Sequence, residues 1–291
     1  MKEALGKFPL RNGGMVAVSE YGDRNGAPVF FCHGWPSSRT MAELTDAAAR
    51  ALGLRVVSSD RPGIRNSSLD RKRKLLDWPP LLAELADSLG MDEFRILGVS
   101  GGAPYALAAA WALPERVHAI AVVSGAPPLA ELTDRAGLLP LYRWLLWFYP
   151  RHRELLRVGF SCARPLLSLK VPIRLRPLLL KFLQPCDASV LRDIAAFDAC
   201  FESQRQAWLA SAEGVMLDAE IYAQPWGFPL EEVRAPVRLW HGKKDRSFDW
   251  RLADSLGKRL PNCVAHMVEG EGHYSLPIRR VDEILADLKS A

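Results

Sequence analysis

The sequence predicts an α/β fold in which a parallel sheet carries helices on both faces. Short apolar runs, typical of strands that are buried on both sides, alternate with segments of helical composition. Polar motifs stand directly after these runs, at the edge where open α/β sheets bind their ligands. A later stretch of about a hundred residues has no strand pattern. We therefore expect a sheet-based core that is interrupted by a helical insertion.

Length and composition agree with such a fold. The 291 residues can bury a large core, and 49% hydrophobic with 24% charged residues is typical of a globular protein. The net charge of +5 is only a weak indication of an acidic partner. Residues 1–7 hold no apolar signal segment, and no run reaches the roughly 18 apolar residues of a membrane span. We expect a cytoplasmic protein, and the sequence gives no indication of its oligomeric state.

The five cysteines are scattered along the chain, so we expect free thiols. They form neither a disulfide framework nor a cluster with histidines, and we expect no metal and no other cofactor. Cys32, beside His33, has two interpretations. It is a reactive thiol or a packed side chain, and its position at the end of an apolar run favours packing.

Apolar runs predict seven strands in all. They lie at residues 15–21, 29–32, 54–58, 94–97, 117–123, 237–242 and 263–268. The helices that we expect between and after them lie at 40–52, 74–89, 103–112, 249–260 and 278–289. Gly90 stands where helices favour a glycine after their last turn.

From Pro127 to Phe228 the pattern changes to apolar segments of helical period, separated by prolines. We therefore divide the chain into a first core part at 1–126, a helical cap at 127–228 and a second core part at 229–291. The cap is basic, because ten Lys and Arg oppose two acidic residues between Asp134 and Lys181. It also carries four neighbouring aromatic residues, Trp144, Trp147, Phe148 and Tyr149.

Two interpretations of this basic segment are open. One is a lid that touches an anionic membrane surface. The other, which we favour, is a solvated basic face whose aromatic side chains pack inward onto the sheet. No recognised nucleic-acid-binding motif is present, so we expect no nucleic acid partner.

The motif Gly98-Val99-Ser100-Gly101-Gly102 lies between the strand at 94–97 and the helix at 103–112. Glycines two residues before and after a serine are typical of the sharp turn called a nucleophile elbow. A Cβ at either glycine would collide with the neighbouring strand and helix. Alone, the motif is explained equally well by an ordinary turn with a serine at the start of a helix.

A nucleophilic serine needs a histidine as base. Of the histidines after Ser100, His273 lies in a glycine-rich loop behind the last predicted strand, from which it can reach the elbow. We expect structural roles for His118 and His266, which lie in strands, and for His241, a packed or loop-bracing residue. His152 lies in the insertion.

The histidine needs an orienting acid. Asp245 follows the strand at 237–242, and we favour it over Asp249, which suits the N-cap of the next helix. Acyl transfer also needs two backbone N–H groups that face the developing oxyanion. Gly101 follows the serine, and Trp35 is the other expected donor because Pro36 has no N–H.

These motifs together resemble the α/β-hydrolase fold superfamily, in its capped branch of esterases and epoxide-hydrolase-like enzymes. The matching segments are residues 33–36, 60–63, 98–102, 241–245 and 272–273. The resemblance implies a mostly parallel eight-stranded sheet with residues 127–228 as a helical lid. It also implies site roles, with Ser100 as nucleophile, Asp245 as acid, His273 as base, and Trp35 and Gly101 as oxyanion hole.

The chain departs from this family pattern in two places. Ser100 stands where epoxide hydrolases and haloalkane dehalogenases carry aspartate, which argues against both of those chemistries. After residues 60–63 the loop reads Ile64-Arg65-Asn66-Ser67, whereas relatives often have a second glycine near Arg65. This difference affects the shape of the loop more than the chemistry.

The expected function is therefore a serine hydrolase that cleaves a carboxylic ester or a related acyl bond through an acyl-enzyme. Its expected partner is a small-molecule acyl substrate. The aromatic and leucine side chains of the cap indicate an apolar acyl or alcohol group, and they are explained equally well as the core of the cap. The same residues leave open an amide, a thioester or a carbon–carbon bond as substrate, and a cofactor-free haloperoxidase activity. A small-molecule receptor with little or no turnover is the alternative from another class.

Overall fold

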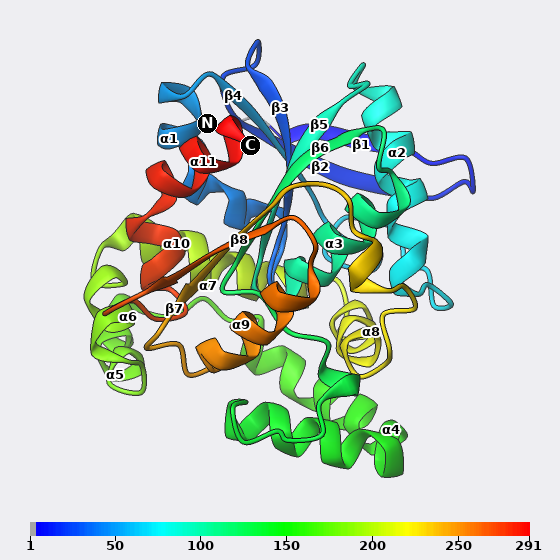
Figure 1. Cartoon of the computed structure of the whole chain (residues 1–291). Coiled ribbons are helices and arrows are strands. Elements are labelled where there is room, and N and C mark those ends of the chain that lie inside the picture. Colours follow the sequence, from blue (N-terminus) through cyan, green and yellow to red (C-terminus); the bar gives the residue numbers. More distant parts are fainter. Residues whose placement is uncertain (1–3) are drawn as a thin grey trace.

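One eight-stranded sheet forms the centre of the fold in the computed structural model, which describes residues 4–291 (Figure 1). The strands lie in the order β1-β2-β4-β3-β5-β6-β7-β8, and only the pairs β1–β2 and β2–β4 are antiparallel. Their bounds are β1 Ala4–Pro9, β2 Met15–Gly22, β3 Ala27–Cys32, β4 Leu54–Ser59, β5 Phe94–Val99, β6 Val117–Val123, β7 Val237–Gly242 and β8 Cys263–Val268. The expected α/β-hydrolase fold with its mostly parallel eight-stranded sheet is confirmed.

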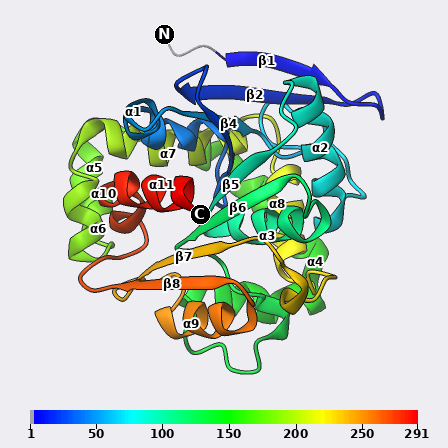
Figure 2. The same cartoon turned by 45° about the horizontal axis from the view of Figure 1, so that its top comes forward.

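The apolar runs identified seven of these strands and missed β1. This strand lies at the edge of the sheet beside β2 (Figure 2). Gly6 and Pro9 make its sequence unlike a strand, and the pairing with β2 shifts register between Ala4 and Gly6. Of residues 1–7, in which we found no signal segment, residues 1–3 lie outside the described part of the chain.

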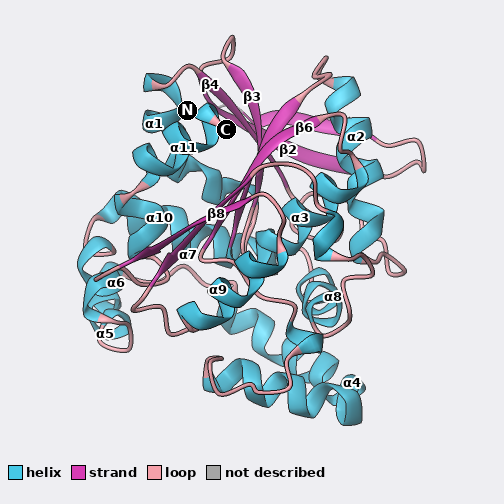
Figure 3. Ribbon diagram, in the orientation of Figure 1, coloured by secondary structure: helices cyan, strands magenta, loops and turns pink. Residues whose placement is uncertain are grey.

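Helices cover both faces of the sheet (Figure 3). Their bounds are α1 Asp46–Ala51, α2 Trp78–Ser88, α3 Ala103–Ala112, α4 Pro140–Leu167, α5 Arg176–Leu180, α6 Pro185–Val190, α7 Ile194–Leu209, α8 Glu213–Tyr222, α9 Trp250–Arg259, α10 Ser275–Arg279 and α11 Val281–Ser290. The single helix that we expected at 40–52 is instead a 3₁₀ helix, Arg39–Thr45, followed by α1. Arg39 anchors that first part, because its backbone N–H and its guanidinium both bond the buried carboxylate of Asp60.

Two hydrophobic cores explain why the strands read as continuous apolar runs. In β5, Phe94 and Ile96 pack with α2, α3 and α9, whereas Leu97 and Val99 pack with α1 and α11 on the other face. Since successive side chains of a strand point to opposite faces, both sets must be apolar. The parallel strands then present their carboxyl ends, and the motifs that follow them, at one edge of the sheet.

The described residues between β6 and β7 add no strand to the sheet and form helices α4 to α8. α4 lies at the bottom of Figure 1 and bends at His152, soon after Pro150. Trp144 and Trp147 are 47% and 54% exposed, so the expectation that the aromatic side chains of this segment pack inward is wrong for these two. Within residues 4–291, no helix is long and apolar enough to cross a membrane.

The loop after β4 contains Arg65, near which relatives often have a second glycine. The backbone of Arg65 has a φ of +47°, in the left-handed region that glycine adopts without strain. Gly63, two residues earlier, also has a positive φ of +86°. The loop therefore keeps a glycine-like conformation at a position that is occupied by arginine.

Replacing Arg65 with glycine should stabilise the fold. A left-handed backbone costs a non-glycine residue about 1–2 kcal/mol, and part of this gain is lost to the greater freedom of glycine in the unfolded chain. We expect Arg65→Gly to raise the free energy of unfolding in urea by up to about 1 kcal/mol. Arg65→Ala keeps the strain and is the matched control. An equal increase in both variants would show that the arginine side chain, and not the backbone, is the source.

Candidate active site

Ser100 stands on a strained turn between β5 and α3. Its φ is +53°, and its side chain is buried at the start of the short 3₁₀ turn Ser100–Gly102. A Cβ added to Gly98 would lie 2.8 Å from the Cβ of Ala106, and one added to Gly102 would collide with the carbonyl oxygen of Cys32. Both glycines are therefore required, as the motif predicted, because no side chain fits at this crossing.

His273 and Asp245 line up behind the serine. The Nε2 atom of His273 lies 3.1 Å from Ser100 Oγ, and its Nδ1 lies 2.7 Å from Asp245 Oδ2. Asp245 follows β7 and His273 lies in the loop between β8 and α10, so both come from the carboxyl edge of the sheet. The structure thus brings the three predicted residues into one chain of hydrogen bonds.

The electrostatics of this chain favour a basic histidine. Burial lowers the pKa of His273, but the charge of Asp245 and its hydrogen bond outweigh burial, so the net shift is upward. For Asp245 burial raises the pKa, but His273 and the backbone N–H of Phe248 outweigh it, so the carboxylate stays ionised. Its Oδ1 also accepts the N–H of Ser247 at 2.7 Å. This arrangement can take a proton from Ser100 and stabilise the resulting imidazolium.

The competing residues have other partners. His241 is buried, and its Nε2 lies 2.9 Å from the carbonyl oxygen of Phe248, so it braces the loop as we expected. Asp249 caps α9 by accepting the N–H of Arg251, which confirms its expected role. The remaining histidines are placed as follows: His118 pairs with Glu93, His266 stacks on Trp240, and His152 marks the bend of α4.

Cys32 packs behind the elbow. It is only 3% exposed, and burial raises the pKa of its thiol to about 12. A thiol with so high a pKa is protonated and unreactive at neutral pH. The geometry therefore supports the packed interpretation of Cys32.

An aspartate that the sequence did not identify holds the loop of His273. Asp187, in α6, is buried and accepts three successive backbone N–H groups. These are the N–H groups of His273 at 3.2 Å, Tyr274 at 2.9 Å and Ser275 at 2.8 Å. Asp187 lies 86 positions before His273, and nothing in its local sequence indicates this contact.

Trp35 and Gly101 meet beside the serine. A Cβ added to Gly101 would lie 3.0 Å from the Cβ of Trp35, and one added to Gly34 would lie 3.4 Å from the Cβ of Ser100. The loop after β3 therefore packs directly onto the elbow. The two expected oxyanion donors thus belong to neighbouring residues on one wall of the site.

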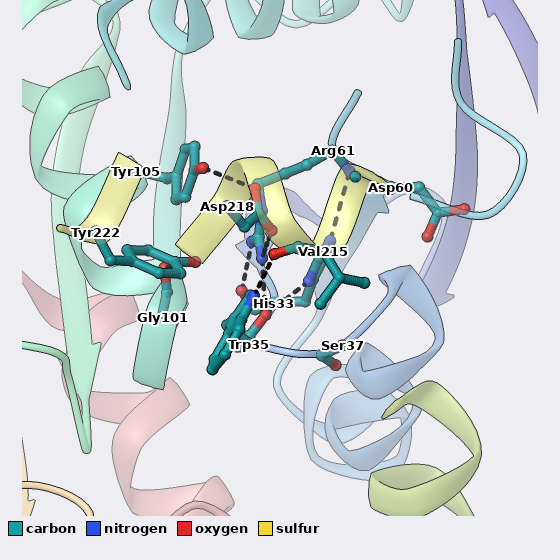
Figure 4. Close-up of polar contacts among 12 residues, drawn as sticks. His33, Trp35, Ser37, Asp60, Arg61, Gly101, Tyr105, Val215, Asp218 and Tyr222 are labelled. Atoms are coloured by element: carbon teal, nitrogen blue, oxygen red, sulfur yellow. Dashed lines mark hydrogen bonds and ion pairs between the residues drawn. The ribbon is translucent and has the colours of Figure 1, made fainter. Parts of the chain in front are cut away.

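A buried charged network packs against this loop (Figure 4). Arg61 is 1% exposed and donates to the carbonyl oxygens of His33 at 2.6 Å and Gly34 at 2.8 Å. It also bonds Asp218 in α8 at 2.9 Å. Burial raises the pKa of Asp218, but the charges of Arg61 and Arg73 outweigh it, so the pKa falls well below its usual range and the group is ionised.

Helix α8 makes two further contacts with the site. The Nε1–H of Trp35 donates to the carbonyl oxygen of Val215 at 2.8 Å, and the hydroxyl of Tyr222 donates to that of Gly101 at 2.9 Å. Val215, Asp218 and Tyr222 are spaced at i, i+3 and i+7, so they share one face of the helix (Figure 4). Asp218 and Tyr222 were not predicted as site residues. The 3.6-residue period of their segment indicates a buried helix face, but it does not show which residues on that face bond the site.

Two hollows open on either side of Ser100. The first has an empty volume of about 630 Å³, part of it open to solvent, and is walled mainly by apolar side chains. Those from α4 are Tyr142, Leu145, Leu146, Tyr149, Leu156 and Phe160. The second hollow, of about 520 Å³, contains His273 and is more polar, with Ser203, Gln204 and Tyr274. Within residues 4–291, no group of three or more His, Cys, Asp or Glu is arranged to hold a metal ion.

Comparison with known proteins identifies the family and the fold. Residues 27–277 match the family described as the alpha/beta hydrolase fold. A stretch of 132 residues is 30% identical to the non-heme chloroperoxidase of Streptomyces lividans and covers 45% of this chain and 48% of that protein. The chain thus matches about half the length of this curated relative.

Solved structures share the fold at low sequence identity. An esterase from Exiguobacterium antarcticum has a TM-score of 0.69 and 19% identity, and 98% of each chain is covered. A bromoperoxidase from Bacillus anthracis has a TM-score of 0.72 and 18% identity, and 96% of each chain is covered. At such identities the likeness establishes the fold alone.

Removing the charge of Asp245 should change the titration of His273. Because the carboxylate stabilises the imidazolium, Asp245→Asn should move the pKa of His273 downward, so that the ring loses its proton at lower pH. The Cε1–H resonance of His273, followed by NMR between pH 4 and pH 9, measures this, with His273→Ala to assign the signal. Asp249→Asn is the control and should leave the titration unchanged. An unchanged titration in Asp245→Asn would contradict the coupling.

Proposed function

The chain belongs to the α/β-hydrolase fold family, and we propose that it is a serine hydrolase that cleaves a carboxylic ester or a related acyl bond. The observation that carries this proposal is the hydrogen-bonded chain from Ser100 through His273 to Asp245. This chain lies beside a hollow whose walls are mainly apolar and suit an acyl group. The fold alone would not support the activity, because many functions share it.

In the proposed mechanism, Ser100 Oγ attacks the substrate carbonyl carbon while His273 Nε2 takes the hydroxyl proton. The electron pair of the carbonyl moves to its oxygen, and the backbone N–H groups of Trp35 and Gly101 stabilise this oxyanion. When the pair returns, the bond to the leaving group breaks and His273 donates its proton to that group. A water molecule, deprotonated by His273, then releases the acid from Ser100.

The position of His273 orients the substrate. The leaving group must receive a proton from His273, so it has to lie in the hollow that contains this histidine. The acyl group then extends into the apolar hollow beneath α4. We therefore propose an apolar acyl group joined to a small leaving group that can bond the polar side chains near Gln204.

A second candidate uses the same acyl-enzyme. The relative named as a non-heme chloroperoxidase, 30% identical over 132 residues, favours it. If hydrogen peroxide replaces water as the second nucleophile, Ser100 leaves and the product is a peroxy acid instead of an acid. The peroxy acid then oxidises a halide ion and is itself reduced to the carboxylic acid. Amide, thioester and carbon–carbon substrates, and a receptor without turnover, remain alternatives that the same experiments separate.

Covalent labelling tests the nucleophile. A fluorophosphonate should add its phosphonyl mass to the peptide that contains Ser100, because the activated hydroxyl displaces fluoride. Ser100→Ala should lose the label and at least about 10³-fold of the turnover of a p-nitrophenyl ester. Both results are read by mass spectrometry and by steady-state kinetics.

The matched control is Ser124→Ala. Ser124 follows β6, is buried and has a φ of +47°, so Ser124→Ala makes the same change at a second left-handed serine without removing the proposed nucleophile. Undiminished ester turnover in Ser100→Ala would disprove the proposal. Labelling of Ser100 without turnover of any ester, amide, thioester or β-diketone would instead favour the receptor.

A further inference from the structure

We propose that Asp218 in α8 is a positioning residue for the oxyanion hole, which it sets through Arg61. This inference rests on the proposed serine hydrolase function. It assigns part of the catalytic geometry to a helix that lies between β6 and β7 in the chain and contributes none of the three reacting side chains.

The peptide unit that joins Gly34 to Trp35 is planar. The carbonyl of Gly34 and the N–H of Trp35 belong to the same planar peptide unit, so fixing one fixes the direction of the other. Arg61 bonds this carbonyl at 2.8 Å and the preceding carbonyl of His33 at 2.6 Å. The direction of the Trp35 N–H is therefore set by the guanidinium of Arg61 together with the ring of His33, whose Nδ1 lies 3.0 Å from the same Gly34 carbonyl oxygen.

Arg61 carries its positive charge in the interior of the protein. A guanidinium that is 1% exposed is stable only beside an opposite charge, and Asp218 bonds its Nε at 2.9 Å. Asp218 is itself completely buried and is held by Arg73 at 2.5 Å and by Tyr105 at 3.0 Å. Asp218 thus fixes the position of Arg61 from α8 (Figure 4).

The other donor is held differently. The N–H of Gly101 shares its peptide unit with the carbonyl of Ser100, which accepts the N–H of Ala126 at 3.0 Å. Ala126 follows β6, so this peptide is fixed by the sheet and not by α8. One oxyanion donor therefore depends on the core and the other on α8, and the two can be perturbed separately.

The test compares Asp218→Asn, Arg61→Lys and the control Glu220→Gln. Removing one oxyanion donor typically costs about 10²–10³-fold in kcat, so we expect Asp218→Asn to lose about that much with KM within about threefold. Affinity for a boronic acid, which forms a tetrahedral adduct with the serine, should fall in parallel. Affinity for a planar ketone of the same shape should not. Glu220→Gln changes a carboxylate of the same helix that bonds Arg153 and Arg157 and not Arg61, and it should keep kcat within about threefold.

Arg61→Lys covers the case in which Asp218→Asn fails to fold. Lysine keeps the charge but cannot bond both carbonyl oxygens in the geometry of the guanidinium. We expect the same loss of kcat and of boronic acid affinity. Boronic acid affinity equal to that of the unmodified protein in either folded variant would overturn the positioning role. Failure of the fluorophosphonate to label Ser100 in the unmodified protein would instead overturn the proposed function.

A second, independent observation concerns the surface of the segment between β6 and β7. Of the sixteen large hydrophobic side chains that are exposed in the described chain, fourteen lie between Leu141 and Ile194. Phe182 is 78% exposed and Ile173 is 71% exposed. Soluble surfaces rarely concentrate apolar side chains in this way unless they bind something.

The positive charge of this segment indicates which kind of partner its surface binds. Residues 155–186 contain no Asp or Glu and six Lys or Arg, of which Arg157 and Arg176 pair with Glu220 and Asp198 on other helices. Lys181 and Arg192 line one surface groove together with Ile173 and Ile194, so basic and apolar groups share a site. A second copy of the chain would place like charges against each other, whereas an anionic lipid surface complements both features. We infer that this face docks on anionic lipid.

Helix α4 of the same segment also forms part of the proposed site. Leu145 and Tyr149 in α4 line the apolar hollow beside Ser100, while Trp144 and Trp147 of the same helix are exposed. Tryptophan and arginine side chains suit the boundary between lipid headgroups and chains.

Sedimentation with phosphatidylcholine vesicles, with and without phosphatidylglycerol, tests this inference. The full chain should bind the anionic vesicles and release them as salt screens the charges. Phe182→Asp and Ile173→Asp should each weaken binding by about tenfold or more, because an apolar contact is replaced by a repelled charge. Val264→Asp, at a 46% exposed position in β8, is the matched control and should bind normally. Absence of binding at low salt, or a solution dimer that Phe182→Asp dissociates, would overturn the inference.

Discussion

The left-handed backbone of Ser100 constrains the packing of every segment around it. A serine in this conformation is strained by about 1–2 kcal/mol, and the turn closes only because Gly98 and Gly102 have no side chains. Gly102 then lies against the carbonyl of Cys32, so the end of β3 must pass beside the elbow. This contact brings the loop of Trp35 onto the serine. The strained turn and the oxyanion loop are therefore consequences of one close backbone crossing.

Two buried carboxylates from outside the sheet hold the loops that meet at this crossing. Asp187 accepts three backbone N–H groups from the loop of His273, and Asp218 neutralises Arg61 beneath the loop of Trp35. A buried carboxylate without donors would cost several kcal/mol, and the loop N–H groups would be unsatisfied without their acceptor. Loop and helix therefore stabilise each other, and neither position is independent of the other.

The sequence predicted features that leave a local pattern. Buried strands appear as apolar runs, and the elbow needs glycines at fixed spacing, so the sheet and Ser100 could be identified. β1 was missed because pairing with β2 outweighs the poor strand propensity of residues such as Gly6. Asp187 and Asp218 act on residues 86 and 157 positions away, and a lone aspartate in a helix gives no sign of such a contact. Composition also led to the wrong expectation that Trp144 and Trp147 pack inward, whereas both are exposed. The apolar content of a helix does not show which of its faces is buried.

The placement of these contacts links substrate choice to catalytic geometry. α4 contributes wall to the apolar hollow but bonds none of the backbone groups at the elbow, so changes in its side chains that face the hollow alter the shape of the hollow and leave those hydrogen bonds in place. α8 does both, because Tyr222 lines the hollow and also bonds the Gly101 carbonyl, one turn from Asp218. A substitution on that face of α8 therefore changes the fit of the proposed acyl group and the position of the loop of Trp35 together. Diversification of substrate preference in this chain is physically easier through α4 than through α8.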